Sequence, residues 1–239
     1  MAASPITSNL VPITPLPSSI LARVNAIPTK PPPFTLSNTT LSIVPYDASS
    51  HASELYAHSS GDAYTSHVRG EEVCVEPYAP GEVVWDYMFY GPFEDEDGFV
   101  AAMSSKDDVA NASAYVVVDN ASESLLGMVW LLNHCPSHLK VEIGSYFLLP
   151  HAHRQGINRE VVDLLKDLVF GEWGYLRLEW KCDARNNRSR ASAKSLGFVY
   201  EGIQESHFII KDRIRDTAWF RILRAEYLDR KGLPAEPLF

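Results

Sequence analysis

The second half of the chain constrains the fold most, because strand-like and helix-like segments follow one another there in a fixed order. Three apolar segments rich in Val, Leu and Ile come in close succession at 114–119, 125–132 and 141–148. The segment 158–170 then carries apolar residues at the spacing of one helix face. A further strand pattern covers 176–182. This order predicts an antiparallel meander that leads into a strand–helix–strand unit.

The remaining periodic segments extend this unit on both sides. We expect further strands at 41–44, at 198–200 with 207–210, and at 216–223, the last after a polar turn over 211–215. Helices are expected from Asp47, from 94–97 through Met103, and over 188–196. In the helix 158–170, the expected solvent-facing residues are Arg159, Glu160, Asp163, Lys166 and Asp167. The predicted fold class is α/β (or α+β), a twisted, mixed and mostly antiparallel sheet of six or seven strands with helices on both faces.

Composition divides the chain into three parts. Residues 1–40 are rich in Pro, Ser and Thr and predict an N-terminal arm that lies on the surface, with plain disorder as the alternative. Residues 41–229 hold the periodic segments and form one predicted domain, and 230–239 form a tail. A hydrophobic content of 46% is enough for a sizeable core.

Charge and cysteine content exclude several classes of protein. A formal net charge of −9 argues against nucleic acid and membrane as partners and favours a cationic or neutral substrate. The chain has no secretory signal pattern and no apolar run near the ~20 residues that span a bilayer. Its three cysteines contain no CxxC pair, so we expect neither a disulfide framework nor a metal site. The expected location is cytoplasmic.

The segment 150–160 joins a predicted strand to the start of a predicted helix. Exposed backbone N–H groups at a helix start attract anions. Gly156 allows the backbone to approach a phosphate closely, while Arg154 and Arg159 add positive charge. These residues alone predict a phosphate-bearing ligand, with an ordinary strand-to-helix loop as the alternative. Neither a Walker loop nor a Rossmann turn is present.

Histidines and aromatic residues give weaker signals. His151 and His153 lie beside the turn without a third ligand nearby, which favours a surface or phosphate-facing role over a metal site. An aromatic cluster either packs in the core, which we favour, or lines a substrate pocket in which its rings hold a cation. The cluster comprises Tyr64, Trp85, Tyr87 and Phe89.

Four motifs occur in a fixed order along the chain. They are Tyr90-Gly-Pro-Phe93, His153-Arg-Gln-Gly-Ile-Asn158, Asn186-Asn-Arg-Ser189 with Leu196-Gly-Phe198, and Arg213-Ile-Arg-Asp216. Together they resemble the GCN5-related N-acetyltransferase (GNAT) superfamily and, within it, the branch that acetylates ribosomal proteins and amino acids. The family turn has the form Arg/Gln-x-x-Gly-x-Gly/Ala, so this chain keeps the central glycine and departs at His153 and Asn158. The resemblance covers roughly residues 40–228.

This resemblance implies an N-acetyltransferase that uses acetyl-CoA, releases CoA and acetylates a primary amine by direct transfer in a ternary complex. The acceptor would be a small-molecule amine, an amino acid or a protein N-terminus, and a homodimer is an assembly that the family allows. The acyl thioester would enter between the splayed fourth and fifth strands, 141–148 and 176–182. The implied cofactor contacts are Phe147, Leu148, Leu149, Arg154, Gln155, Gly156, Ile157, Asn158, Arg159, Asn186 and Ser189.

Acyl transfer to an amine also needs a base for the amine proton. Glu142 is the first candidate, because histone-acetylating relatives carry a Glu-Ile pair that matches Glu142-Ile143. A solvent-facing strand residue is the alternative for Glu142. Glu179, on the partner strand, is the second candidate.

The resemblance does not assign a single proton donor to the leaving thiolate. A backbone amide near Leu148 or Leu149 would meet the oxyanion. Many relatives have a Tyr where this chain has Ala193, so either Ser189 or Ser192 supplies a proton or the thiolate leaves without a dedicated acid. The departures from the family pattern keep a noncatalytic acyl-CoA-binding protein as the alternative function. A different phosphate-ligand enzyme, such as a small kinase, is a more distant one.

Overall fold

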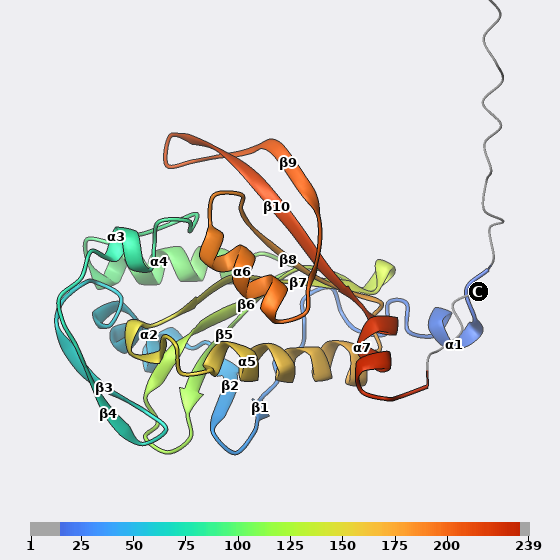
Figure 1. Cartoon of the computed structure of the whole chain (residues 1–239), viewed down its shortest axis with the longest axis horizontal. Helices are drawn as coiled ribbons and strands as arrows, with labels where there is room; N and C mark the ends of the chain where they lie inside the picture. Colours follow the sequence, from blue (N-terminus) through green and yellow to red (C-terminus); the bar gives the residue numbers. More distant parts are fainter. Residues whose placement is uncertain (1–14, 235–239) are drawn as a thin grey trace, which may run out of the picture.

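The computed structural model describes residues 15–234, so 1–14 of the predicted arm and 235–239 of the predicted tail lie outside the described residues. A central sheet of eight strands has the order β1-β2-β5-β6-β7-β8-β10-β9 (Figure 1). All neighbouring strands are antiparallel except β7 and β8, which are parallel. The strands are β1 Leu36–Ser37, β2 Leu41–Pro45, β5 Ser113–Asp119, β6 Leu125–Cys135, β7 Lys140–Leu148, β8 Arg177–Asp183, β9 Val199–Ile210 and β10 Arg213–Leu223. The predicted mixed sheet is confirmed, and β1 adds a short eighth strand.

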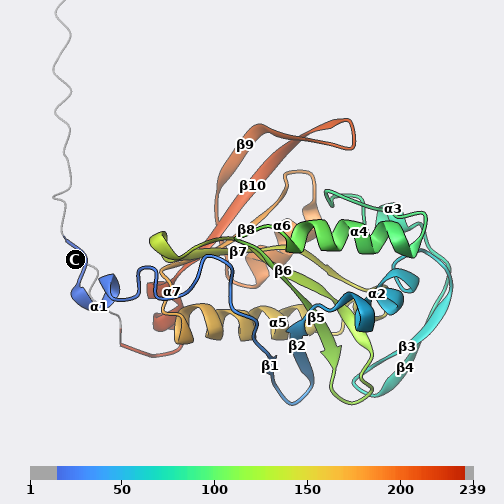
Figure 2. The ribbon, with the colours of Figure 1, turned by 180° about the vertical axis from the view of Figure 1, so that it is seen from behind.

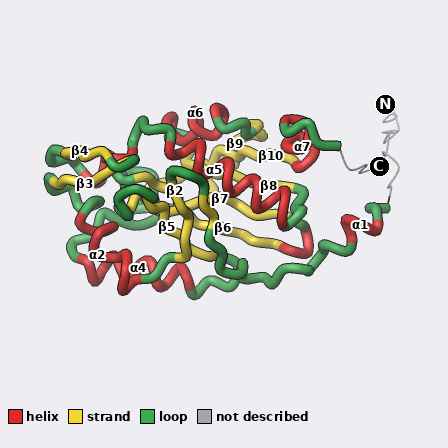
Figure 3. The backbone as a smooth tube through the Cα atoms, turned by 90° about the horizontal axis from the view of Figure 1, so that it is seen from below, coloured by secondary structure: helices red, strands yellow, loops and turns green. Residues whose placement is uncertain are grey.

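Helices cover both faces of this sheet, as Figure 3 shows from below. On one face α5, α6 and α7 contribute to a core cluster with the sheet, and on the other face α2 and α4 do so. The longer helices are α2 Ala48–Ala57, α4 Glu96–Asp107, α5 Ile157–Lys166, α6 Asn187–Ser195 and α7 Arg224–Arg230. Short helices are α1 Ser18–Leu21 and α3 Pro80–Val83, and a π-helical turn, Asp167–Glu172, continues α5. Within the described chain, no helix combines the length and the apolar character that a membrane crossing requires.

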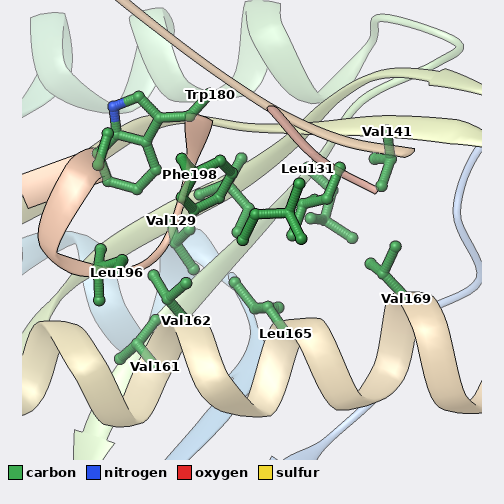
Figure 4. Close-up of a cluster of buried hydrophobic side chains, with 14 of the residues drawn as sticks. Val129, Leu131, Val141, Val161, Val162, Leu165, Val169, Trp180, Leu196 and Phe198 are labelled. Carbon is green, nitrogen blue, oxygen red and sulfur yellow. The ribbon is translucent and has the colours of Figure 1, made fainter. Parts of the chain in front are cut away.

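Helix α5 packs on the sheet through the apolar face that its periodicity predicts. Val161 and Leu165 point toward the strands in Figure 4, and both are fully buried. The expectation that Lys166 faces solvent is wrong, because this side chain is buried. Its alkyl stem packs in the interior while Nζ donates to the Leu196 carbonyl at 2.8 Å and to Asp163 at 2.9 Å.

Strand β7 changes faces halfway along its length. Val141 and Ile143 belong to the core cluster on the α5 side, whereas Phe147 belongs to the cluster on the α2 and α4 side. Regular alternation would keep these odd-numbered residues on one face. The switch occurs at Ser145, which has a φ of 43°, and the β6–β7 register shifts across the same region. Pairing with β8 ends at Ile143–Trp180, so the two strands separate beyond this point.

Several elements differ from their predictions. The hairpin β3 Tyr64–Val68 and β4 Glu71–Val75 was not expected, because its strands are polar and its two-residue turn is Arg-Gly rather than Asn-Gly. Strand β9 is continuous where two short pieces were expected. The polar turn predicted over 211–215 is wrong at its end, since β10 begins at Arg213 and Arg215 is buried.

Residues 15–40 run along the edge of the body toward β1, as Figure 2 shows from behind. Ile20 is fully buried in the core cluster. Farther along, the Phe34 ring stacks on Tyr115 with centroids 4.0 Å apart. The carbonyl of Thr29 lies 2.8 Å from Nδ1 of His134. This part of the arm is therefore packed against the domain.

His151 lies at the junction between β7 and α5, and it is 2% exposed. The surface role expected for it is therefore wrong. Its Nδ1 is 3.0 Å from the Tyr64 hydroxyl and its Nε2 is 3.3 Å from the Ser66 hydroxyl, so it ties the β3–β4 hairpin to this junction. Burial, helped by nearby His58, lowers the pKa of His151 to about 4. Among the described residues, no group of three or more His, Cys, Asp or Glu side chains could hold a metal ion.

This buried histidine predicts a loss of stability in acid. The folded-state pKa of about 4 lies below the ordinary value of 6.5, so its contribution is present above pH 6.5 and falls as the pH drops toward 4. The free energy of unfolding, measured with urea, should fall between pH 7 and pH 4.5 by about 2 kcal/mol more in wild type than in His151→Gln. The exposed control His138→Gln should behave as wild type. If the free energy of unfolding of wild type and of H151Q depends on pH to the same extent, His151 does not cause the loss of stability in acid.

Candidate functional site

A cleft of about 610 Å³ opens where β7 and β8 separate. Residues 142–148 of β7 and 180–183 of β8 form its two strand walls. The start of α6, the turn before α5 and the segment 83–89 close it from other sides. Arg215 of β10 also lines it. The cleft therefore lies between the two strands predicted to splay.

The segment 83–89 covers the cleft and is anchored from two sides. Lys211, in the turn between β9 and β10, donates to the Trp85 carbonyl at 2.6 Å, and Arg188 donates to the Glu82 carbonyl at 3.0 Å. Trp85 is buried in the core cluster, as favoured for the aromatic residues. Tyr87 and Phe89 instead line the cleft. The aromatic cluster thus contributes both to the core and to a pocket.

The backbone of β7 offers one of its edges to the cleft. The amide of Leu149 donates to the Leu126 carbonyl at 2.9 Å, so it faces β6. Because successive residues of a strand point their N–H and C=O groups to opposite sides, those of Leu148 face the cleft. Nε2 of His153 lies 3.0 Å from the Leu148 carbonyl oxygen. The side chains of Phe147 and Leu149 are buried, and among residues 147–149 it is Leu148 that presents its backbone to the cleft.

The turn before α5 has the geometry of an anion cradle. Gly156 is the N-cap of α5 with a φ of 80°, and no side chain within residues 15–234 caps the first-turn amides. Gly156 and Arg154 both adopt positive φ values, 80° and 63°. Arg69 of the β3–β4 hairpin donates to the Gln155 carbonyl at 3.0 Å and pairs with Glu160 at 2.5 Å. The hairpin therefore fixes the turn through side-chain contacts, without capping the first amides of α5.

Side chains of α5 and α6 complete this end of the cleft. Asn158 donates to the Ser192 hydroxyl at 2.5 Å, and its Oδ1 is buried without a hydrogen-bond partner among the described residues. Asn186 caps α6, since its Oδ1 accepts from the Ser189 amide at 2.9 Å. The Ser189 hydroxyl accepts from Trp180 Nε1 at 3.0 Å. The residues of this region that line the cleft are Asn158, Asn186, Arg188, Ser189 and Ser192.

These features fit a ligand that carries a pyrophosphate and an extended arm with amide groups, as CoA does. Uncapped amides at the start of α5 suit a pyrophosphate, and the free backbone edge at Leu148 suits an extended amide-bearing arm. The unpartnered Oδ1 of Asn158 can accept a hydrogen bond from the same ligand. The side chains of Ile157 and Arg159 point elsewhere, since Ile157 is buried in the core and Arg159 donates to the Ser195 carbonyl at 3.0 Å. The contacts predicted for these two residues are made by their backbone amides and stay a prediction.

Glu142 and Glu179 are direct neighbours across the parallel pair of β7 and β8. Glu142 is 5% exposed, which excludes the solvent-facing alternative. Its Oε2 accepts from Asn133 at 2.6 Å and from Lys181 at 2.7 Å. Its Oε1 accepts no hydrogen bond from a described residue and lies 3.2 Å from where a Cβ on Gly144 would be, at the start of the separation. Glu142 therefore keeps one oxygen available in the cleft.

Glu179 is committed to other partners and does not line the cleft. It accepts from Arg177 at 2.7 Å and pairs with Lys181 at 3.0 Å. Burial acts to raise the pKa of Glu179, but these hydrogen bonds outweigh it and the net shift is downward. Glu179 is thus held as a carboxylate that positions Lys181.

Tyr146 is a residue of the cleft that sequence reasoning missed. Its hydroxyl is buried without a hydrogen-bond partner among the described residues, and its ring meets Trp180 edge-on at 5.9 Å. Burial raises the pKa of Tyr146, so the hydroxyl stays protonated at neutral pH. No sequence signal marks it, because the bulge at Ser145 decides which side of β7 it takes.

Comparisons with known proteins identify the family of this fold. The Acetyltransferase (GNAT) domain family matches residues 51–199. No curated protein matches the chain by sequence. The structure resembles that of a probable acetyltransferase (GNAT family) from Chromobacterium violaceum ATCC 12472, with a TM-score of 0.75 and 30% identity over 94% of this chain and 99% of the other.

Two further solved structures extend the comparison. A GCN5-related N-acetyltransferase from Brucella melitensis has a TM-score of 0.74 and 29% identity, and 87% of each chain is covered. Spermidine N-acetyltransferase from Vibrio cholerae, in complex with CoA and spermine, shares the fold, with a TM-score of 0.58 and 19% identity over 80% of this chain and 99% of the other. On the family match and the first of these structures, the chain belongs to the GNAT acetyltransferase domain family.

Proposed function

We propose that the chain is an acetyl-CoA-dependent N-acetyltransferase that moves the acetyl group directly to a primary amine in a ternary complex. One observation carries this proposal: pairing of β7 with β8 stops at Ile143, and the resulting cleft holds both a free backbone edge and the carboxylate of Glu142. GNAT acetyltransferases use acetyl-CoA, and the uncapped turn at Gly156 suits its phosphates. The four sequence motifs support the branch that acetylates ribosomal proteins and amino acids.

At this end of the cleft, acetyl-CoA would be bound by backbone groups more than by charged side chains. Amides at the start of α5 would hold the pyrophosphate, and the Leu148 backbone would pair with the pantetheine arm. Asn158 and Asn186 would position the arm between α5 and α6. When bound, acetyl-CoA supplies the acetyl group as a thioester that an amine can attack.

Glu142 would accept the proton of the attacking amine, directly or through one water molecule, at its free Oε1. The amine nitrogen forms a bond to the acetyl carbon, the carbon–sulfur bond breaks, and the thiolate leaves. Lys181 forms ion pairs with both Glu142 and Glu179, and these contacts fix the Glu142 side chain in place. The proton on Glu142 then returns to solvent, and the thiolate takes one up as CoA.

Tyr146 would stabilise the charge that develops during this transfer. Its protonated hydroxyl can donate a hydrogen bond, but complete proton transfer to a thiolate of pKa about 8.5 would be uphill from a phenol whose pKa is raised. We therefore assign it hydrogen bonding rather than acid catalysis. Ser189 and Ser192 remain the proposed contacts for the departing thiolate through water.

Release of CoA thiol tests the function and the base together. With acetyl-CoA and a panel of amino acids, peptides and spermidine, wild type should release thiol with at least one amine. Glu142→Gln should lower kcat by about 100-fold at unchanged affinity for acetyl-CoA, whereas the exposed control Glu205→Gln should not. Unchanged kcat in E142Q removes Glu142 from this role. CoA binding without thiol release for any amine would favour the noncatalytic alternative.

The role of Tyr146 has its own test. Tyr146→Phe removes only the hydroxyl, so kcat should fall by about 100-fold with little change in the affinity for acetyl-CoA. Tyr200→Phe, on the exposed face of β9, is the matched control. The assignment fails if Y146F retains the wild-type kcat in the same thiol-release assay.

A further inference from the structure

Arg215 is a buried cationic residue of the cleft. It lies on β10 two residues before Thr217, which forms the last β10–β8 pair with Asp183. The side chain is 6% exposed, and it lines the cleft that Glu142 also lines. The sequence-based turn over 211–215 placed it at the surface, whereas the strand carries it inside.

The guanidinium of Arg215 has no polar partner among the described residues. Its Nε is buried without a hydrogen bond, and no described carboxylate forms an ion pair with it. Its neighbours are aromatic: the ring centroids of Phe89 and Phe208 lie 4.6 Å and 5.9 Å from its Cζ. Stacking on rings stabilises the cation but satisfies none of its five N–H donors.

The acidic residues of the cleft are already engaged by other cations. Asp183 accepts from Nε of Arg185 at 3.0 Å and from Nη2 at 2.8 Å. Glu142 pairs with Lys181 at 2.7 Å. Burial acts to lower the pKa of Arg215, and the more distant Asp183 and Glu142 oppose this shift without removing it. An arginine remains protonated even so, which leaves a buried positive charge in need of a ligand.

We infer that Arg215 binds a carboxylate of the acceptor, so the amine that is acetylated belongs to an amino acid or to a peptide with an acidic side chain near its amine. This inference rests on the proposed transfer to an amine. The planar fork of a guanidinium matches a carboxylate in two parallel hydrogen bonds. The five N–H donors and the charge of Arg215 are then satisfied by the substrate itself.

Arg215 is not placed to bind the phosphates of CoA. Their cradle is the turn at Gly156, which follows β7, whereas Arg215 lies on β10, beyond β8 in the sheet order. Arg215 also lines a second, smaller pocket with Asp86, Tyr87 and Lys211, and no residue of β7 lines this pocket. The acceptor would therefore enter from the β10 side, with its carboxylate at Arg215 and its amine toward Glu142.

The test compares matched acceptors that differ only in the carboxylate. Free amino acids are compared with their carboxamides, and peptide amides that begin with Asp with those that begin with Asn. Wild type should prefer the carboxylate form by about 100-fold in kcat/KM. Arg215→Met should reduce this preference to near unity, mainly through a lower kcat/KM for the carboxylate form, while the affinity for acetyl-CoA stays unchanged. The control Arg230→Met, at an exposed arginine that lines neither pocket, should keep the preference.

Stability and binding separate this inference from the proposed function. R215M should melt at the same temperature as wild type or higher, because it removes a buried cation without a partner. Calorimetry with N-acetylated amino acids and CoA-bound protein should show binding that R215M loses by a similar factor. If amines are acetylated without carboxylate preference, or R215M unfolds readily, the inference about Arg215 is overturned. If carboxylates bind through Arg215 but no amine is acetylated, the proposed transfer fails instead.

Discussion

The loss of backbone pairing between β7 and β8 beyond Ile143 is the constraint on which the rest of the site depends. Polar backbone groups in the middle of a sheet need partners, and the bulge at Ser145 turns residues 144–148 away from β8. The structure meets this need only in part, since Nε2 of His153 lies within hydrogen-bond distance of the Leu148 carbonyl oxygen. A ligand with its own amide groups completes the edge, which is why a break in the sheet and a binding cleft coincide here.

The charged residues at the cleft fall into two groups. One network joins Glu142, Lys181, Glu179 and Arg177 and holds each member by at least one ion pair. Arg215 lies outside it and has aromatic neighbours instead of a counter-ion. The acidic overall charge of −9 favours a cationic or neutral substrate, yet the buried surroundings of one arginine indicate an acceptor that carries a carboxylate. An amino acid, neutral overall as a zwitterion, satisfies both.

Periodicity predicted the architecture because it reports which face of each element is buried. The meander 114–148 and the amphipathic face of α5 were recognisable for this reason, and the motif from Asn186 to Phe198 indicated the family. Features that depend on tertiary placement were not predictable. The bulge at Ser145 moves Tyr146 into the cleft, and the course of β10 buries Arg215 within what reads as a polar turn. The burial of His151 likewise depends on a hairpin whose turn carries no strong signal.

Hydrogen exchange at single-residue resolution tests most directly whether the separated strands and the α5 turn form one cofactor site. Addition of acetyl-CoA should slow amide exchange at Leu148 and at the uncapped first turn of α5. Exchange in the turn at Lys211 and Asp212, between β9 and β10, should remain unchanged. Protection confined to other segments, or slower exchange at the α5 turn without any change at Leu148, would contradict the account.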